Sequence, residues 1–350
     1  MQTKVINIKD IKIGDNNPIV IQTMWKDHLT TGDLTDIIHK IDTLAAMGCG
    51  LLRFAVPDLG TAEILGELAQ TVSMPLVADI HFDYKIALRC MDFPIAKIRI
   101  NPGNIGGKDK TATVLEKAGA KSIPIRIGVN AGSLPGDLQE RVNTGMRPAL
   151  ALVEAAEREV SIFKEFGFTQ YIVSMKASGI ADTIEANRIF SERTDAPLHL
   201  GVTEAGPLIA GVASRAVALT TLLKEGIGDT IRVSLSDTME NEIIAGREIL
   251  RASGLKAGGV KIVSCPRCGR HGFDTHGFTN RWLSRLYSLD KDITVAIMGC
   301  EVNGPIEAKH ADIGITGVGE KVLIFRHGEI VKTISREDAD EIFEEELSNL

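Results

Sequence analysis

Three cysteines in the last third of the chain have the spacing of metal ligands. Cys265 and Cys268 are two residues apart in "SCPRCGRHG", and Cys300 follows in "MGCEVNGPIEAKH". Zinc sites and iron–sulfur clusters both use this pattern, and spacing alone does not separate them. In a cluster held by three cysteines, Glu307 could ligate the remaining iron. A zinc site could be completed by a histidine, for which the candidates are His271, His276 and His310.

Positively charged residues interrupt five of the β-rich runs in the earlier part of the chain. They are Arg53, Arg99, Arg126, Lys176 and Arg232, each in or near the carboxyl half of its run. Buried parallel strands are normally continuous apolar segments, and unpaired cations that converge repel one another and cost desolvation energy. The set therefore predicts a polyanionic ligand, and phosphate suits arginine well. The alternative is that each cation pairs with an acidic neighbour such as Asp79 or Glu204.

Other polar residues follow the same runs. They are Asp79, His81, Asn101, Asn104, Asn130, Glu204 and Ser234. Glu204, in "GVTEAG", is a carboxyl group among cations that could act as an acid or a base, and simple charge balance is the alternative. For His81, a structural hydrogen bond explains its position as well as catalysis does.

These residues must be positioned by eight β-rich runs that alternate with amphipathic helical patterns. The runs are "PIVIQTM", "LLRFAV", "PLVADIHF", "KIRINPG", "PIRIGVNAG", "YIVSMKAS", "PLHLGVTEAG" and "DTIRVSLS". Eight alternations predict an α/β fold with a parallel sheet, and eight is the number that closes a TIM (β/α)₈ barrel. An open doubly wound sheet is the alternative, but its glycine-rich phosphate loop is missing. In a barrel, the cations would share the mouth formed by the carboxyl ends of the strands.

Two domains are predicted, residues 1–257 and 258–350. The leading "TKVINIKDIKIG" is typical of a hairpin that caps the amino-terminal face of the barrel. After the last barrel helix, "LKAGG" indicates a linker. The remaining segment predicts a smaller α/β domain, in which "KVLIFRHGEIVKTI" forms a hairpin and "SREDADEIFEEELSNL" a terminal helix.

Composition excludes several functional classes. The 350 residues carry 39 basic and 46 acidic side chains, a net charge of −7, so no global charge attracts nucleic acid or anionic membranes. No apolar run is long enough to span a bilayer, and the first residues lack the apolar core of a signal peptide. Five cysteines favour the reducing cytoplasm over a disulfide framework. Cys49 and Cys90 stand alone in apolar surroundings and are expected to be buried thiols.

Four motifs closely resemble those of one enzyme family. "SCPRCGR", "MGCEVNGPIEA", "KIRINPGNIG" and "LHLGVTEAG" are similar to 4-hydroxy-3-methylbut-2-enyl diphosphate synthase of the methylerythritol phosphate route to isoprenoids, in its bacterial two-domain form. The resemblance runs from "PIVIQTM" to "ADIGITG". It implies an oxidoreductase with a [4Fe-4S] cluster that opens and dehydrates 2-C-methyl-D-erythritol 2,4-cyclodiphosphate with two electrons. It also implies ferredoxin or flavodoxin as the electron donor, and a homodimer in which one subunit's cluster domain closes on the other's barrel.

The resemblance also implies a role for individual residues. The cluster would be ligated by Cys265, Cys268, Cys300 and Glu307, and Glu204 would donate a proton. The substrate would be bound by Arg53, Arg99, Arg126, Asn130, Lys176, Arg232 and Ser234 of the barrel and by Asn303 of the cluster domain. Two motifs depart from the family pattern: "QTMWKDH" stands for "QSMTNT", and "NGPIEA" stands for "NGPGEA". If the second needs positive φ, Ile306 would be strained.

Two other functions compete with this interpretation. One is a zinc-ribbon-like binding module attached to a phosphate-binding barrel. The other is a barrel enzyme of non-redox phosphate-ester chemistry with structural zinc. Colour separates them from a cluster enzyme, because an iron–sulfur protein is brown and a zinc protein is colourless.

Overall fold

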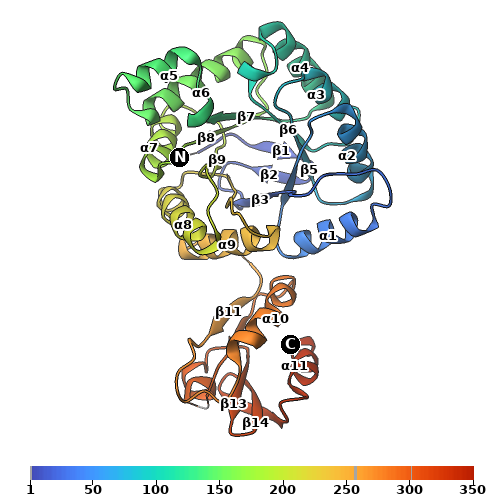
Figure 1. Ribbon diagram of the computed structural model, residues 1–350, viewed down its shortest axis with the longest axis vertical. Coiled ribbons are helices and arrows are strands. Elements are labelled where there is room, and N and C mark those ends of the chain that lie inside the picture. Colours follow the sequence, from blue (N-terminus) through green and yellow to red (C-terminus); the bar gives the residue numbers. More distant parts are fainter. Residues whose placement is uncertain (1, 256–257, 301) are drawn as a thin grey trace. The chain divides into compact units, whose positions relative to one another are not determined.

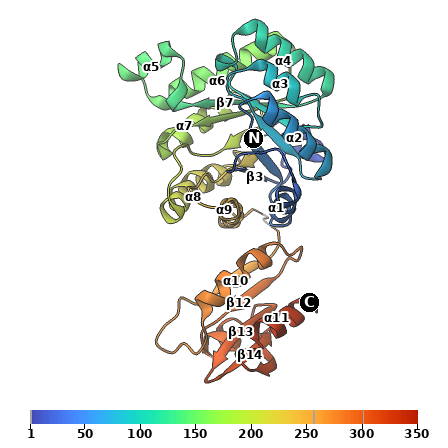
Figure 2. The ribbon, with the colours of Figure 1, turned by 45° about the vertical axis from the view of Figure 1, so that its right-hand side comes forward.

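The chain forms two compact units, Met1–Ala257 and Gly258–Leu350, shown in the computed structural model of Figure 1 and, in a turned view, Figure 2. The structure describes residues 2–255, 258–300 and 302–350, with the side chains of residues 102, 302 and 303 left out. None of the helices in these described ranges is long and apolar enough to cross a membrane.

The first unit is a closed barrel of eight parallel strands. They are hydrogen-bonded in the order β8-β7-β6-β5-β4-β3-β10-β9, and a parallel bridge between Val173 and Leu198 joins β8 to the residue before β9. The strands are β3 (Val20–Met24), β4 (Leu51–Ala55), β5 (Leu76–Asp79), β6 (Lys97–Ile100), β7 (Ile125–Asn130), β8 (Tyr171–Lys176), β9 (His199–Leu200) and β10 (Thr230–Ile231). The predicted (β/α)₈ barrel is confirmed, and the open sheet is wrong.

At least one helix follows each strand and covers the outside of the barrel (Figure 1). Local sequence sets several of their starts. Asp58 caps α2 by accepting a hydrogen bond from the Thr61 N–H, and Thr238 caps α9 in the same way. The helices are α1 (Thr35–Ala46), α2 (Leu59–Thr71), α3 (Tyr84–Cys90), α4 (Lys108–Lys121), α5 (Gly136–Asn143), α6 (Pro148–Glu165), α7 (Ile180–Ser191), α8 (Leu208–Lys224) and α9 (Met239–Ala252).

A hairpin of β1 (Ile6–Ile8) and β2 (Ile11–Ile13) closes the amino-terminal face of the barrel. Three of its isoleucines, Ile6, Ile8 and Ile13, are fully buried and Ile11 is partly buried. They pack against residues at or near the starts of barrel strands, namely Leu51, Val77, Ala96 and Ile172. The predicted capping hairpin is confirmed, and the carboxyl ends of the strands are left as the face for a site. Cys49 and Cys90 are buried, as expected.

The second unit is a five-stranded mixed sheet with two helices. Its strands lie in the order β11 (Lys261–Ser264), β12 (Thr294–Ile297), β13 (Ile313–Val318), β14 (Lys321–Arg326) and β15 (Glu329–Ile334). The strands β11, β12 and β13 are parallel to one another, and β14 is antiparallel to both of its neighbours, β13 and β15. The predicted hairpin of β14 and β15 is confirmed. Its two-residue turn consists of His327 and Gly328, with φ of 49° and 87°, as both central positions of such a turn need positive φ.

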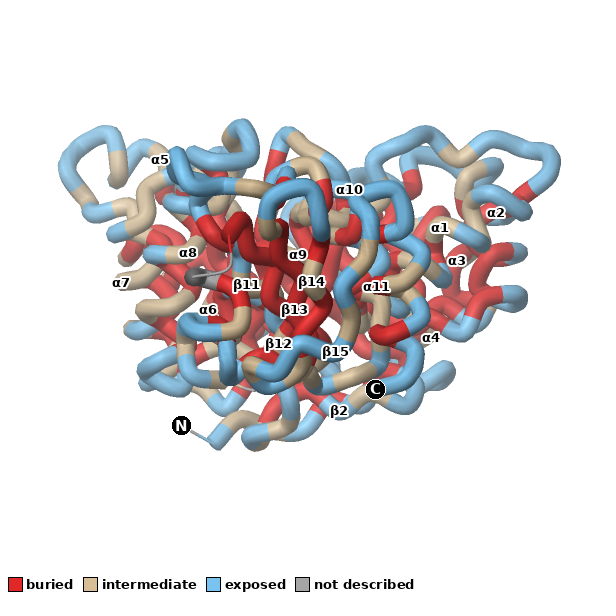
Figure 3. The backbone as a smooth tube through the Cα atoms, turned by 90° about the horizontal axis from the view of Figure 1, so that it is seen from below, coloured by how far each residue is buried: buried red, intermediate tan, exposed pale blue. Residues whose placement is uncertain are grey.

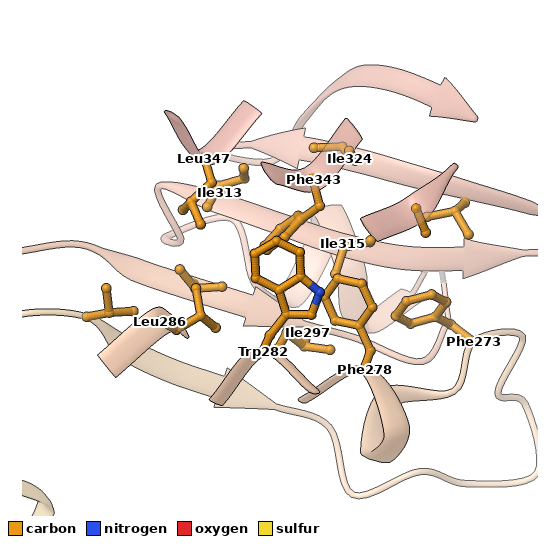
Figure 4. Close-up of a cluster of buried hydrophobic side chains, with 14 residues drawn as sticks. Phe273, Phe278, Trp282, Leu286, Ile297, Ile313, Ile315, Ile324, Phe343 and Leu347 are labelled. Carbon is orange, nitrogen blue, oxygen red and sulfur yellow. The ribbon is translucent and has the colours of Figure 1, made fainter. Parts of the chain in front are cut away.

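Aromatic packing holds α10 (Thr275–Tyr287) and α11 (Ala339–Ser348) to this sheet (Figure 4). The ring centroids of Phe278 and Trp282 are 5.6 Å apart, and Phe343 meets Trp282 edge to face at 5.0 Å. The indole N–H of Trp282 donates to Asp340 at 2.6 Å, so its polar group is satisfied. In Figure 3 the buried backbone runs through the sheets, and the exposed backbone lies mainly in loops and outer helices. This core fixes β11 and β12, whose ends lead into the cysteines.

Candidate functional site

A cavity of about 190 Å³ lies at the carboxyl ends of the barrel strands. All five cations singled out in the sequence line it. The lining residues are Arg53, Asp79, His81, Arg99, Arg126, Asn130, Ser174, Lys176, Val202, Thr203, Arg232 and Ser234. Five strands of a closed barrel thus bring five positive charges into a volume that holds one small molecule.

Asp79 pairs with two of these cations. Arg99 Nη1 donates to Asp79 Oδ1 at 3.0 Å, and Arg53 Nε lies 3.6 Å from Oδ2. Arg99 Nη1 also lies 2.8 Å from His81 Nε2. Burial raises the pKa of Asp79, but Arg53, the His81 hydrogen bond and Arg99 outweigh it and hold the pKa far below its usual range. Asp79 is therefore ionised. Its pairing with Arg53 and Arg99 compensates the burial of these two cations.

Glu242 on α9 pairs with Arg232, and its role was not foreseen from the sequence. Its Oε2 lies 3.4 Å from Arg232 Nε, and it accepts hydrogen bonds from Thr23 Oγ1 at 2.6 Å and from the Leu235 N–H at 3.0 Å. Glu242 is only 1% exposed. A signal was present, because "MENEIIAG" places Glu242 on the face of the helix that otherwise buries Met239 and Ile243.

Arg126 and Lys176 form no ion pair in the described parts of the chain. Arg126 is 1% exposed, and its Nε and Nη1 have no hydrogen-bond partner there. Burial, Arg53 and Arg99 lower the pKa of Arg126, while burial, Arg126 and Arg53 lower that of Lys176. Buried donors and charges without partners are costly. An anionic ligand would supply both the opposite charge and the missing acceptors.

Two strand glycines make room for the cations and were not singled out from the sequence. A Cβ on Gly128 of β7 would lie 2.7 Å from Arg99 Nε, and a Cβ on Gly201, just after β9, would lie 2.9 Å from Lys176 Nζ. A glycine inside a strand pattern often marks such a close approach.

Lys97 is a buried cation that was also not singled out from the sequence. It is fully buried in β6 with its Nζ 3.2 Å from Gln22 Oε1.

Glu204 lies just outside the cavity lining. It is exposed and follows Thr203, which does line the cavity. Its φ of +57° is in the left-handed region, which is uncommon for a residue with a side chain. Glu204 makes no ion pair with any of the five cations in the described parts of the chain.

In the second unit, parallel pairing of β11 with β12 carries two cysteines to one edge of the sheet. Cys265 directly follows β11, and its N–H donates to the Ile297 carbonyl at 3.2 Å, three residues before Cys300. A Cβ on Gly299 would lie 3.1 Å from Cys265 Sγ, so the Cys265 thiol lies over the residue that precedes Cys300. Cys265 and Cys300 are buried, whereas Cys268 is exposed.

The short helix η3 (Val302–Glu307) follows Cys300 and ends at Glu307. The Gly304 N–H donates to the Cys300 carbonyl at 2.9 Å, and Glu307 is exposed. Ile306 is not among the residues with positive φ, so the expected strain is absent. The side chain of Asn303 lies outside the described part. Within the described ranges, no three His, Cys, Asp or Glu side chains are already arranged as metal ligands.

Both units match known protein domains. Residues 3–247 match the family domain described as "GcpE TIM-barrel domain", and residues 261–349 match "GcpE protein C-terminal domain". The chain belongs to the GcpE family.

Curated relatives are similar in sequence to this GcpE chain along nearly its whole length. A protein of Treponema denticola is 51% identical over 97% of this chain and 92% of its own length. A protein of Treponema pallidum is 50% identical over 98% of this chain and 89% of its own. A protein of Thermodesulfovibrio yellowstonii is 44% identical over 99% of this chain and 98% of its own length. All three are named 4-hydroxy-3-methylbut-2-en-1-yl diphosphate synthase (flavodoxin), which confirms the family resemblance.

One carboxyl group of this GcpE chain makes its stability depend on pH. Glu159 on α6 accepts a hydrogen bond from the Gly103 N–H in the loop after β6, and its Oε2 is buried without a partner among the described residues. Burial raises its pKa from 4.5 to about 7. The stability that Glu159 contributes is therefore complete below pH 4.5 and is lost as the pH rises through about 7.

We expect Glu159→Gln to stabilise the barrel at pH 8 and to leave its stability at pH 4.5 nearly unchanged. The amide keeps an acceptor for the Gly103 N–H but carries no charge to desolvate, so the gain at pH 8 is at most about 3 kcal/mol. Urea unfolding at both pH values measures it. Glu165→Gln, at the exposed end of the same helix, is the matched control. A Glu159→Gln chain that is less stable than wild type at pH 8 contradicts the prediction.

Proposed function

We propose that this chain converts 2-C-methyl-D-erythritol 2,4-cyclodiphosphate to 4-hydroxy-3-methylbut-2-enyl diphosphate by reductive ring opening and loss of water, in isoprenoid biosynthesis. The observation that carries the proposal is the excess of positive charge in the barrel cavity. Five cations meet there, and among the residues that the structure describes only Asp79 and Glu242 form ion pairs with them. A cyclic diphosphate is a compact dianion that fits this excess. The relatives are named as synthases of the same product.

In this proposal the barrel residues bind the diphosphate in two ways. Arg126 and Lys176, which have no acidic partner in the described part of the chain, take its charge directly. Arg53, Arg99 and Arg232 are held by carboxylates and present their remaining N–H groups at fixed positions. The neutral side chains of Asn130 and Ser234 line the same cavity and would orient the substrate through hydrogen bonds. Asn303 would reach the substrate from the other domain.

Glu204 would act as the proton donor of the reaction. Loss of a hydroxyl group as water needs a proton at that oxygen. Glu204 follows the cavity-lining residue Thr203 and is open to solvent, from which it can be reprotonated. The cations near it would stabilise the negative charge that remains on the diphosphate.

The residues of the second unit fit a [4Fe-4S] cluster. Three thiols suit iron–sulfur chemistry, the Cys265 and Cys300 positions follow neighbouring strands, and Gly299, which has no side chain, lets the Cys265 thiol lie close to the residue before Cys300. Cys265, Cys268 and Cys300 would hold the cluster, with Glu307 as an exchangeable fourth ligand. When bound, the cluster would transfer electrons singly and offer one iron as a Lewis acid. The relatives' names specify flavodoxin, an electron carrier. Zinc is redox-inactive and could not accept electrons from it.

The experiment that tests this function is anaerobic purification followed by assay. The expected result is a brown, iron-containing protein that converts the cyclic diphosphate when supplied with reduced flavodoxin, or with ferredoxin as the second candidate donor. We place the enzyme in the cytoplasm, a compartment in which cysteine thiols stay reduced. A colourless zinc protein that binds the cyclic diphosphate without turnover would favour the zinc-containing alternatives instead.

We further propose that the working enzyme is a homodimer with shared active sites. Helix α9 runs antiparallel to the strands and ends at the amino-terminal face of the barrel, opposite the cavity. The "LKAGG" segment, of which residues 256 and 257 lie outside the described part of the chain, can reach at most about 18 Å at ~3.6 Å per residue. Helix α6 alone has 18 residues, about 27 Å at ~1.5 Å per residue, so the linker is shorter than the barrel is deep. A second subunit with two-fold symmetry solves this problem.

Mixing two inactive chains tests the shared site. A Cys265→Ser chain lacks a cluster ligand, and a Glu204→Gln chain lacks the proton donor. A mixed dimer would contain one site with both lesions and one with neither, so up to about a quarter of wild-type activity should return when half the dimers are mixed. The control is each chain exchanged with itself. Subunit exchange without recovered activity, or an active monomer, contradicts the shared site.

A further inference from the structure

Arg215 contacts the backbone of the segment that carries Glu204. It belongs to α8, the helix after β9, and only 4% of its surface is exposed. Its Nη2 donates to the Thr203 carbonyl at 3.1 Å and also to the Glu204 carbonyl. Its Nη1 donates to Ser214 Oγ at 2.7 Å. One buried guanidinium therefore binds two successive carbonyl groups at the mouth of the barrel.

The segment that Arg215 binds has a restricted conformation. Glu204 has a φ of +57°, and a residue with a side chain remains in this region only where its surroundings enforce it. On one side of it, the Thr203 N–H donates to the Ala177 carbonyl at 3.1 Å. On the other side, Gly206 forms a parallel bridge with Leu235. The barrel fixes both ends of the segment, and Arg215 binds the carbonyl groups between them.

Burying Arg215 has a cost that packing alone does not explain. Its Nε has no hydrogen-bond partner in the described residues, and no carboxylate there lies within 4.0 Å of it. Burial lowers its pKa, and the negative charge of Glu204 raises it, so the two charged groups are near one another. A buried cation with no carboxylate in contact is unfavourable. Apart from the bond to Ser214 on its own helix, the hydrogen bonds of Arg215 go to the segment of Glu204, so we look for its effect there.

We propose that Arg215 is a positioning residue, which holds the Thr203 and Glu204 carbonyl groups and thereby sets the direction in which the Glu204 side chain is presented to the substrate. The inference rests on the proposed function, in which Glu204 donates a proton. Arg215 does not line the substrate cavity and acts only through Glu204. Arginine suits the task better than lysine, because its planar fork offers several donors in fixed geometry.

Variants of the holoenzyme test this role. In Arg215→Gln, kcat should fall roughly ten- to a hundredfold, the effect of a small misplacement of a catalytic group, while KM changes less than about twofold. Arg215→Lys, which keeps the charge but not the fork, should recover part of kcat. Arg247→Gln is the matched control, since Arg247 is equally buried but donates to the carbonyl of Met47, the residue after α1. It should lower the unfolding midpoint and leave kcat unchanged.

A double variant separates positioning from a general loss of stability. In a Glu204→Gln background, adding Arg215→Gln should lower kcat by less than about twofold, because residues that act as a unit are not additive. A full multiplicative loss in that background overturns the proposal. So does wild-type kcat in Arg215→Gln or, if that chain does not fold, in Arg215→Lys. If Glu204→Gln itself keeps wild-type kcat, the role of Glu204 fails too. If only the Arg215 variants are fully active, the positioning role alone fails.

Discussion

Replacing Cys300 with serine is expected to remove both the brown colour and the activity of the enzyme. Cys300 follows β12 at the sheet edge where Cys265 follows β11, so the two thiols come from neighbouring strands. A serine hydroxyl is a poor iron ligand, because clusters are held by thiolates. Even groups behind a metal ligand change metal affinity or activity ten- to a hundredfold, so loss of a ligand should lower turnover at least about a hundredfold. Iron content, visible absorbance and turnover measure the effect.

Cys49→Ser is the matched control for Cys300→Ser. Cys49 is also buried, and its thiol donates to the Leu51 carbonyl at 3.2 Å, a hydrogen bond that a serine hydroxyl retains. It lies in the barrel and has no part in the proposed site. Cys49→Ser should keep the iron and the turnover of wild type. A Cys300→Ser chain that also kept both would refute the cluster assignment.

The barrel was predictable because its signals are local and repeat. Each of the eight strands lies within a predicted β-rich run, from "PIVIQTM" for β3 to "DTIRVSLS" for β10. In a closed barrel, a cation in the carboxyl half of its strand lies near the carboxyl-terminal face of the barrel. The convergence of Arg53, Arg99 and Arg232 at that face could therefore be predicted from the topology. The hairpin turn at His327 and Gly328 was likewise encoded by two adjacent residues.

Of the acidic partners of the cations, Asp79 was named from the sequence and pairs with Arg53 and Arg99. Glu242 was not predictable, because its pairing depends on contacts between distant elements. Arg232 pairs with Glu242 of α9 rather than with Glu204, and hydropathy does not show which helix face meets which strand end. The space for Arg99 and Lys176 comes from glycines on neighbouring strands, a relation between strands that single runs do not encode. The left-handed backbone of Glu204 depends equally on its surroundings.

Arg126 and Arg232 should affect substrate binding alike but stability in opposite directions. Both line the cavity, and losing a charge-assisted contact with the diphosphate costs about 1.5–3 kcal/mol, or a roughly ten- to hundredfold weaker affinity. In the free protein they differ. Arg126 is buried without an acidic partner in the described residues, whereas Arg232 pairs with Glu242. We therefore expect Arg126→Met to raise the unfolding midpoint and Arg232→Met to lower it.

The physical reason lies in what each substitution leaves behind. Arg126→Met removes a charge whose burial opposes folding, and the methionine fills the space of the aliphatic stem with an apolar chain. Arg232→Met leaves Glu242, which is 1% exposed, with Lys26 at 3.0 Å as its one remaining cation among the described residues. Substrate affinity by calorimetry and thermal unfolding without substrate measure the two effects, and visible absorbance should stay unchanged. Affinities within twofold of wild type for both variants would count against a diphosphate site in the barrel. Unfolding midpoints that change in the same direction in both variants would count against the proposed charge imbalance.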